Sequence, residues 1–220
     1  MSHFQFQTVS NIISGLGSIY ELKQLLQQQP YKKLLLVTDA GMIQQQLHLP
    51  IIEILETIQL DYVIYSSVQA DPPEHIVLDA VQFAKNEKAD IVLGFGGGSS
   101  LDVAKIIAIL AHPQQQQTLS DLYGINNAKP PRLPLFLVPT TAGTGSEVTP
   151  ISIVTTGETT KTGIVSPVLF ADVAILDATF TQNLPAHITA ATGIDAMVHA
   201  IEAYTSKIKK NPYADMLAKQ

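Results

Sequence analysis

The sequence predicts an α/β protein with a doubly wound, mostly parallel sheet, followed by the beginning of an all-helical second domain. Short, continuous apolar runs alternate with segments of helical periodicity, which is typical of parallel sheets buried on both faces. Two of these runs end in loops rich in glycine and hydroxyl side chains, and the pattern after Leu184-Pro185 is wholly helical. We therefore expect a Rossmann-like domain over residues 1–184 and the start of a helical domain, apparently truncated, over residues 185–220.

The first half of the chain alternates between strand and helix patterns. The apolar run 33–37 predicts a buried strand whose exit loop is Thr38-Asp39-Ala40-Gly41. Apolar residues that follow Pro73 fall on one face of a helix: Ile76, Val77, Ala80, Val81 and Ala84. By the same patterns we expect further helices over 51–60 and 101–111, and further strands over 61–65 and 91–95.

The second half continues this pattern and then changes. We expect strands over 133–138 and 173–177, and a hairpin of 151–156 and 162–166 around the turn 157–161. A polar run beginning at Gln114 predicts a surface connection. A second helix of the last domain is expected to begin at Pro212, since proline favours the first turn of a helix.

Composition limits the possible functions. The 220 residues include 46% hydrophobic and 15% charged residues, as in a globular protein, and no cysteine, which excludes disulfides and thiolate ligands. A net charge of −6 argues against a nucleic-acid partner. The small basic cluster 207–210 is expected at the C-terminal end of a helix. The start of the chain does not resemble a signal peptide and no apolar run is long enough to span a membrane, so we expect a cytoplasmic protein without a membrane partner.

The most informative segment is the glycine-rich loop 96–102, directly after the strand expected over 91–95. Gly96, Gly97 and Gly98 leave main-chain N–H groups bare at the start of a helix, where a diphosphate can approach. The segment lacks the G-x-G-x-x-G spacing of the common dinucleotide motif, and a tight structural turn is the alternative. Ser99 and Asp102 also fit a capping box, with Ser99 as the N-cap.

Two further sets of polar residues follow predicted strands. Asp39 is placed to accept hydrogen bonds from an adenosine ribose, which would favour NAD over NADP, or else serves as an Asx-turn residue. The loop 139–147 carries three threonines at the carboxyl end of a strand, where ligands bind in such sheets; the alternative is a flexible loop. These threonines are Thr140, Thr141 and Thr144.

A third motif places a carboxylate and an imidazole four residues apart. Asp195 and His199 share one face of a helix and could bind one divalent cation. Alternatively, residues 192–195 form a capping box and His199 is a satisfied core histidine. The cations nearest the glycine-rich loops are Lys105, which is expected to extend from its buried face toward solvent, and Lys161, which either reaches a cofactor or solvates its turn.

Taken together, residues 96–105, 139–149 and 193–204 resemble the iron-containing (group III) alcohol dehydrogenases. The resemblance implies an NAD-binding α/β domain, a helical metal-binding domain and an active site between them. It implies that Asp195 and His199 are metal ligands and that Asp102 and His199 lie at the reacting atoms. The implied cofactor contacts are Asp39, Gly97, Gly98, Ser99, Asp102, Thr140, Thr141, Thr144 and Lys161.

The resemblance also implies an activity: hydride transfer between a small-molecule alcohol or aldehyde and NAD, with Fe²⁺, or else Zn²⁺, polarising the oxygen. It further implies a homodimer. The family often has asparagine where this chain has Asp71, and supplies two histidine ligands from beyond position 220, so we expect a fragment of a longer polypeptide. The alternatives are a truncated, non-catalytic NAD-binding module and an NAD- and zinc-dependent lyase resembling dehydroquinate synthase.

Overall fold

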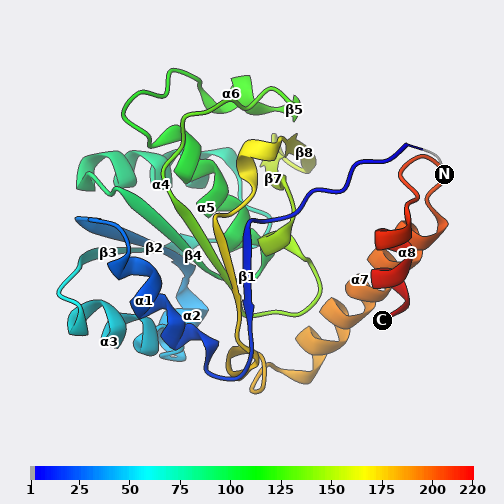
Figure 1. The fold of residues 1–220 in the computed structure, drawn as a ribbon. Coiled ribbons are helices and arrows are strands. Elements are labelled where there is room, and N and C mark those ends of the chain that lie inside the picture. Colours follow the sequence, from blue (N-terminus) through cyan, green and yellow to red (C-terminus); the bar gives the residue numbers. More distant parts are fainter. Residues whose placement is uncertain (1–2) are drawn as a thin grey trace.

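The computed structural model describes residues 3–220 as an α/β body with two helices to one side of it (Figure 1). Six strands form the main sheet in the order β1-β9-β6-β4-β2-β3, and every pair of neighbours is parallel. The strands are β1 (Asn11–Ser14), β2 (Lys33–Asp39), β3 (Asp61–Val68), β4 (Ile91–Gly96), β6 (Leu135–Pro139) and β9 (Val173–Leu176).

Helices cover both faces of this sheet, which confirms the doubly wound fold. Alternate residues of each strand face opposite sides, so Leu35 packs with one set of helices and Leu36 with the other. The first set is α4 (Glu74–Glu87) and α5 (Gly98–Leu110), and the second includes α1 (Leu22–Gln27) and α3 (Leu49–Thr57). The close approach of α5 to β4 requires glycine at Gly94, where a Cβ would lie 2.8 Å from that of Ala104.

Several short elements connect these layers. They are the helices α2 (Ala40–Gln44) and α6 (Leu119–Leu122), and the 3₁₀ turns η1 (Ser18–Glu21), η2 (Ser146–Val148), η3 (Pro167–Leu169) and η4 (Ala178–Phe180). The expected hairpin is confirmed as β7 (Ile151–Thr156) and β8 (Thr160–Val165), which form a small second sheet with β5 (Gly124–Ile125). Main-chain pairing between Pro73 and Thr155 holds this hairpin against the loop that precedes α4.

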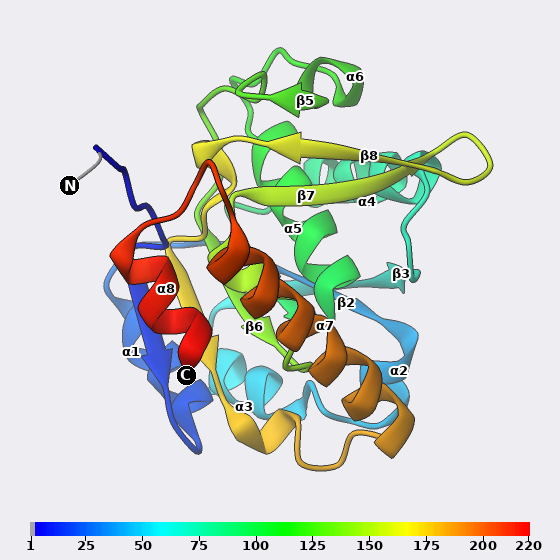
Figure 2. The same ribbon diagram turned by 90° about the vertical axis from the view of Figure 1, so that its right-hand side faces the viewer.

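The chain then leaves the α/β body and forms α7 (Ala186–Thr205) and α8 (Pro212–Lys219), which lie side by side (Figure 2). The domain boundary at residue 184 stays a prediction. Two expectations about this region are wrong. Residues 207–210 follow α7 instead of ending it, because the helix stops at Thr205, and Thr192 lies in the interior of α7, so it cannot cap that helix. No helix within residues 3–220 is long and apolar enough to cross a membrane.

Candidate functional site

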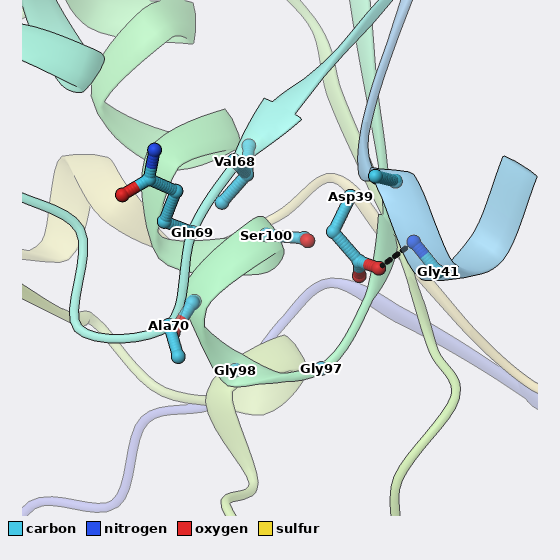
Figure 3. A pocket seen from close by; sticks show the side chains of 10 residues that line it. Asp39, Gly41, Val68, Gln69, Ala70, Gly97, Gly98 and Ser100 are labelled. Carbon is cyan, nitrogen blue, oxygen red and sulfur yellow. Dashed lines mark hydrogen bonds between the residues drawn. The ribbon is translucent and has the colours of Figure 1, made fainter.

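The order of the strands places a crevice between β2 and β4. From β2 the chain continues outward to β3, whereas from β4 it continues in the opposite direction to β6. Ligands of doubly wound sheets bind at the carboxyl ends of strands at this reversal. A cavity of about 430 Å³ lies there (Figure 3). Its lining residues are Asp39, Ala40, Gly41, Val68, Gln69, Ala70, Gly97, Gly98, Ser99 and Ser100.

Asp39 ends β2 and serves as the N-cap of α2. Its Oδ1 accepts hydrogen bonds from the main-chain N–H groups of Gly41 (2.8 Å) and Met42 (3.2 Å). The local turn that was the alternative to ribose binding is therefore present. It engages only Oδ1, so Oδ2, which lies beside Gly96, retains its capacity to accept a hydrogen bond.

The glycine-rich loop shapes the start of α5. Gly96 has a φ of 146°, and a Cβ there would lie 2.7 Å from Ser100 Oγ, so other residues would be strained and would clash. The N-cap is Gly97, and no side chain caps the helix. The expected capping box of Ser99 and Asp102 is therefore wrong. Without a cap, the first N–H groups of α5 lack a side-chain partner and suit an anion such as a diphosphate.

The threonine-rich loop after β6 packs against these glycines. Thr140 N–H donates to the carbonyl of Gly96 (2.9 Å), and a Cβ at Gly98 would lie 3.0 Å from Thr144 Cγ2. Thr141 is the nearest side chain to Gly97. The Thr140 hydroxyl is buried and has no hydrogen-bond partner among the described residues. This buried hydroxyl and the bare amides of α5 fit a polar, phosphate-bearing ligand.

A second cavity, of about 810 Å³, connects the glycine-rich loop with the acid–imidazole pair of α7. Residues from five elements and their loops line it. Those that carry polar or charged side chains are Asp71, Ser99, Asp102, Thr144, Ser146, Thr149, Lys161, Asp195 and His199. Most of the sequence-predicted cofactor and metal residues therefore line one space. The exceptions are Asp39 and Gly97, which line the first cavity, and Thr140 and Thr141, which lie beside the glycine-rich loop.

Asp195 and His199 project from the same side of α7. Asp195 Oδ1 lies 3.8 Å from His199 Nε2, and both side chains are about half exposed. Two ligand atoms of a tetrahedral ion at about 2.1 Å lie roughly 3.4 Å apart, so the pair fits one cation after a small adjustment. Within residues 3–220 no group of three or more His, Asp or Glu side chains gathers in a way that suits a metal. The described residues therefore supply two ligands of a site that ordinarily needs three or four.

Lys161 and Asp71 line this cavity and form an ion pair. Lys161 Nζ lies 2.6 Å from Asp71 Oδ1, and both side chains are more than half exposed. The ion pair joins the β7–β8 hairpin to the loop after β3. The Lys161 ammonium thus binds a carboxylate of another element, and both expectations for it, contact with a cofactor and solvation of its turn, stay predictions.

A model of the family described as "Iron-containing alcohol dehydrogenase" matches residues 10–178, and one of "Fe-containing alcohol dehydrogenase family, C-terminal" matches residues 189–220. The chain belongs to the iron-containing alcohol dehydrogenase family.

Individual members of the family resemble the chain closely. Long-chain-alcohol dehydrogenase 1 of Geobacillus thermodenitrificans is 40% identical over 93% of this chain and 51% of its own length. The structure of a 1,3-propanediol oxidoreductase is 34% identical, with a TM-score of 0.92 over 99% of this chain and 56% of that one. A sulfoacetaldehyde reductase from Bifidobacterium kashiwanohense, solved in complex with NAD⁺, is 28% identical with a TM-score of 0.89, covering 99% of this chain and 57% of that one. The chain spans about half the length of the curated relatives it matches.

The sequence-based interpretation missed three residues that line the first cavity. Val68, Gln69 and Ala70 line the first cavity but were not identified, although they follow the predicted strand 61–65. That strand runs three residues further than its apolar pattern suggests. These residues reach the cavity because β3 lies next to β2 in the sheet. The sequence does not show the order of the strands, so it gave no signal for them.

Proposed function

We propose that this protein is an NAD-dependent alcohol dehydrogenase that transfers a hydride between an alcohol or aldehyde and nicotinamide, with a divalent metal, iron foremost, at Asp195 and His199. One observation carries this proposal. The cavity lined by Gly98 and Ser99 of the glycine-rich loop is also lined by the acid–imidazole pair. A dinucleotide held at the first amides of α5 and a cation held by α7 would therefore share one space.

Each set of residues has a distinct task in binding NAD. Asp39 Oδ2 accepts from the adenosine ribose, and the uncapped amides at Gly98 and Ser99 bind the diphosphate. Thr141 and Thr144 lie against Gly97 and Gly98, and the nearby Thr140 hydroxyl is buried without a partner, so these hydroxyls would bind the same ligand. Lys161 lines the second cavity and would contact the cofactor there. Bound NAD supplies the hydride acceptor for alcohol oxidation.

Asp195 and His199 would hold the cation, because carboxylate and imidazole suit Fe²⁺ and also Zn²⁺. A divalent cation bound there supplies Lewis-acid polarisation of the alcohol oxygen. The chain's own contribution is orientation: Asp102 lines the cavity between the glycine-rich loop and α7, where the cofactor and the cation would meet. The homodimer and the cytoplasmic location stay predictions.

The nucleotide part is tested on residues 1–220 with Gly97→Ala. A Cβ at Gly97 meets its nearest neighbour, Thr141, at an ordinary 3.7 Å, so the variant should fold, yet its methyl group would stand at the expected position of the diphosphate. We expect NADH binding, followed by fluorescence, to weaken about tenfold or more. Gly193→Ala on α7, where nothing lies within 4 Å, is the control and should bind normally. A wild-type chain that does not bind NADH would overturn the proposal.

The metal part is tested by calorimetry with Fe²⁺. Two ligands predict weak binding to residues 1–220, and Asp195→Ala should abolish it. Alcohol oxidation, followed as NADH absorbance, is measured on the product of the complete gene. NADH binding without any turnover over a series of alcohols and aldehydes would instead support the non-catalytic nucleotide-binding module.

A further inference from the structure

Lys105 is a fully buried lysine beside the second cavity. It lies on α5 with 1% of its surface exposed. Its ammonium Nζ donates to Ser146 Oγ (2.8 Å) and to the carbonyl of Ile151 (2.6 Å), and lies 3.4 Å from Asp102 Oδ1. The expectation that Lys105 extends toward solvent is therefore wrong, because η2 and β7 cover it and provide polar partners.

The directions of these hydrogen bonds require a charged lysine. Ser146 Oγ donates its own hydrogen to Asp102 Oδ1 (2.5 Å), so it can only accept from Lys105. The Ile151 carbonyl and the Asp102 carboxylate are acceptors as well. Three acceptors need three N–H donors, which the ammonium has and the neutral amine lacks.

The same network fixes the position of Asp102. The carboxylate Oδ2 accepts from Ile153 N–H (2.9 Å), and Ser152 Oγ donates to the Asp102 carbonyl (3.0 Å). The Asp102 side chain is 14% exposed and lines the cavity, whereas Lys105 does not reach it. Lys105 can therefore affect a ligand there only through Asp102 and Ser146.

We propose that Lys105 is a positioning residue whose buried ammonium, directly and through Ser146, holds the Asp102 carboxylate in the orientation that the bound dinucleotide requires. The inference rests on the proposed function, because it assumes that NAD occupies this cavity. A buried charge is costly, and an apolar side chain could fill the same volume without that cost. The ammonium adds a defined orientation of Asp102, which an apolar side chain cannot provide.

This role predicts a pH dependence. Burial lowers the pKa of Lys105 below its ordinary 10.5, although the Asp102 and Glu147 carboxylates oppose the shift. Asp102 faces the ammonium from α5 and Glu147 from η2, while β7 offers main-chain groups. Above the lowered pKa one N–H donor is lost, so Asp102 is held less firmly and NADH affinity should fall. Between the lowered pKa of folded Lys105 and its ordinary pKa in the unfolded chain, the unfolded state binds more protons, so the contribution of Lys105 to the free energy of unfolding rises with pH. Titration of Lys105 therefore does not unfold the protein, and the expected loss of NADH affinity has another cause.

The test measures NADH dissociation constants on residues 1–220 from about pH 6 to about pH 10. Wild type should lose affinity at the alkaline end. Lys105→Met should bind roughly tenfold more weakly at neutral pH and show no alkaline loss. Lys105→Arg should recover part of the affinity and also lack the alkaline loss, because guanidinium stays charged. Lys23→Met, at an exposed lysine of α1, should behave as wild type.

Ser146→Ala keeps the ammonium but removes the hydroxyl between Lys105 and Asp102, and it replaces Lys105→Met if that variant does not fold. We expect it to weaken NADH binding severalfold without altering the far-ultraviolet circular dichroism. Wild-type affinity and an unchanged pH profile in the Lys105 variants, or wild-type affinity in Ser146→Ala, would refute the positioning role alone. Absence of NADH binding to the wild-type chain would instead refute the proposed function.

Discussion

Asp39 divides its two carboxylate oxygens between folding and ligand binding. Oδ1 accepts from Gly41 N–H and caps α2 (Figure 3). Oδ2 lies beside Gly96. In the proposed function, this negative charge lies where the dinucleotide would place its adenosine ribose. A 2′-phosphate at that ribose would meet an electrostatic repulsion that a 2′-hydroxyl would not.

Asp39→Asn separates these two tasks. Asparagine caps helices as well as aspartate does, so the free energy of unfolding should change little. Loss of the charge should reduce the preference for NADH over NADPH by roughly tenfold, corresponding to an electrostatic term on the order of 1 kcal/mol. The measurement is a pair of fluorescence titrations with the two reduced cofactors. An unchanged ratio of dissociation constants would place the ribose elsewhere.

Single residues were harder to predict than motifs. The glycine-rich and threonine-rich loops were identified because main-chain exposure after a buried strand is visible in the sequence. The partners of Asp102 and Lys105 were not, because Ser146 and Ile151 lie more than 40 residues further along the chain. A capping box is a local pattern, and here the tertiary contact with η2 and β7 replaced it.

Helix α7 contacts the α/β body through the threonine-rich loop. A Cβ at Gly143 would lie 2.3 Å from the carbonyl oxygen of Thr192, a separation that real Cβ atoms do not show. This loop and this helix can therefore approach only because position 143 lacks a side chain. The contact also sets the distance between the glycine-rich loop and the acid–imidazole pair.

Two glycine-to-alanine variants should have opposite effects. Gly143→Ala must displace α7 or the loop, and overpacking of this kind costs about 1–3 kcal/mol. Gly193 lies in the middle of α7 on its exposed surface, and a Cβ there would have nothing within 4 Å. Gly193→Ala should therefore stabilise the protein by about 0.5–1 kcal/mol. Chemical denaturation measures both. Equal stabilities for the two variants would mean that the loop does not pack on the helix in solution.

Strands buried on both faces were predicted well, whereas one of the two edge strands was missed. Strands β2, β4, β6 and β9 were recognised from their continuous apolar runs, with end points within two residues of the structure. Strand β1 was missed because it has four residues, mostly exposed, on an outer edge of the sheet. Its sequence, Asn-Ile-Ile-Ser, has no periodicity long enough to distinguish it from a loop.

At the scale of the whole molecule, Asp177 connects the segment after β9, the last strand of the α/β body, with the segment after β1, its first strand. It follows β9 and is 2% exposed. Oδ1 accepts from the N–H groups of Gly17 and Thr179, and Oδ2 accepts from the N–H of Ile19. Burial alone would raise the pKa of Asp177, but the hydrogen bonds outweigh burial and lower it.

The sign of this shift fixes its effect on stability. A carboxyl group with a lowered pKa in the folded state stabilises the protein above its unfolded pKa and loses that effect as the pH falls through the folded pKa. Asp177→Asn replaces one acceptor by a donor, and should lower the free energy of unfolding at neutral pH by about 1–3 kcal/mol. The difference from wild type should shrink below about pH 4. Thermal unfolding at neutral and acidic pH measures it, and a pH-independent difference would contradict the argument.

The pairing of β1 with β9 has a consequence for biosynthesis. Gly17 and its partner Asp177 are 160 residues apart, and β1 hydrogen-bonds to β9 within the main sheet. Strand β1 must therefore stay unpaired with β9 until almost the whole α/β body has been translated. Because contacts between distant parts of a chain slow folding, we expect β1 to dock late, onto a sheet assembled without it.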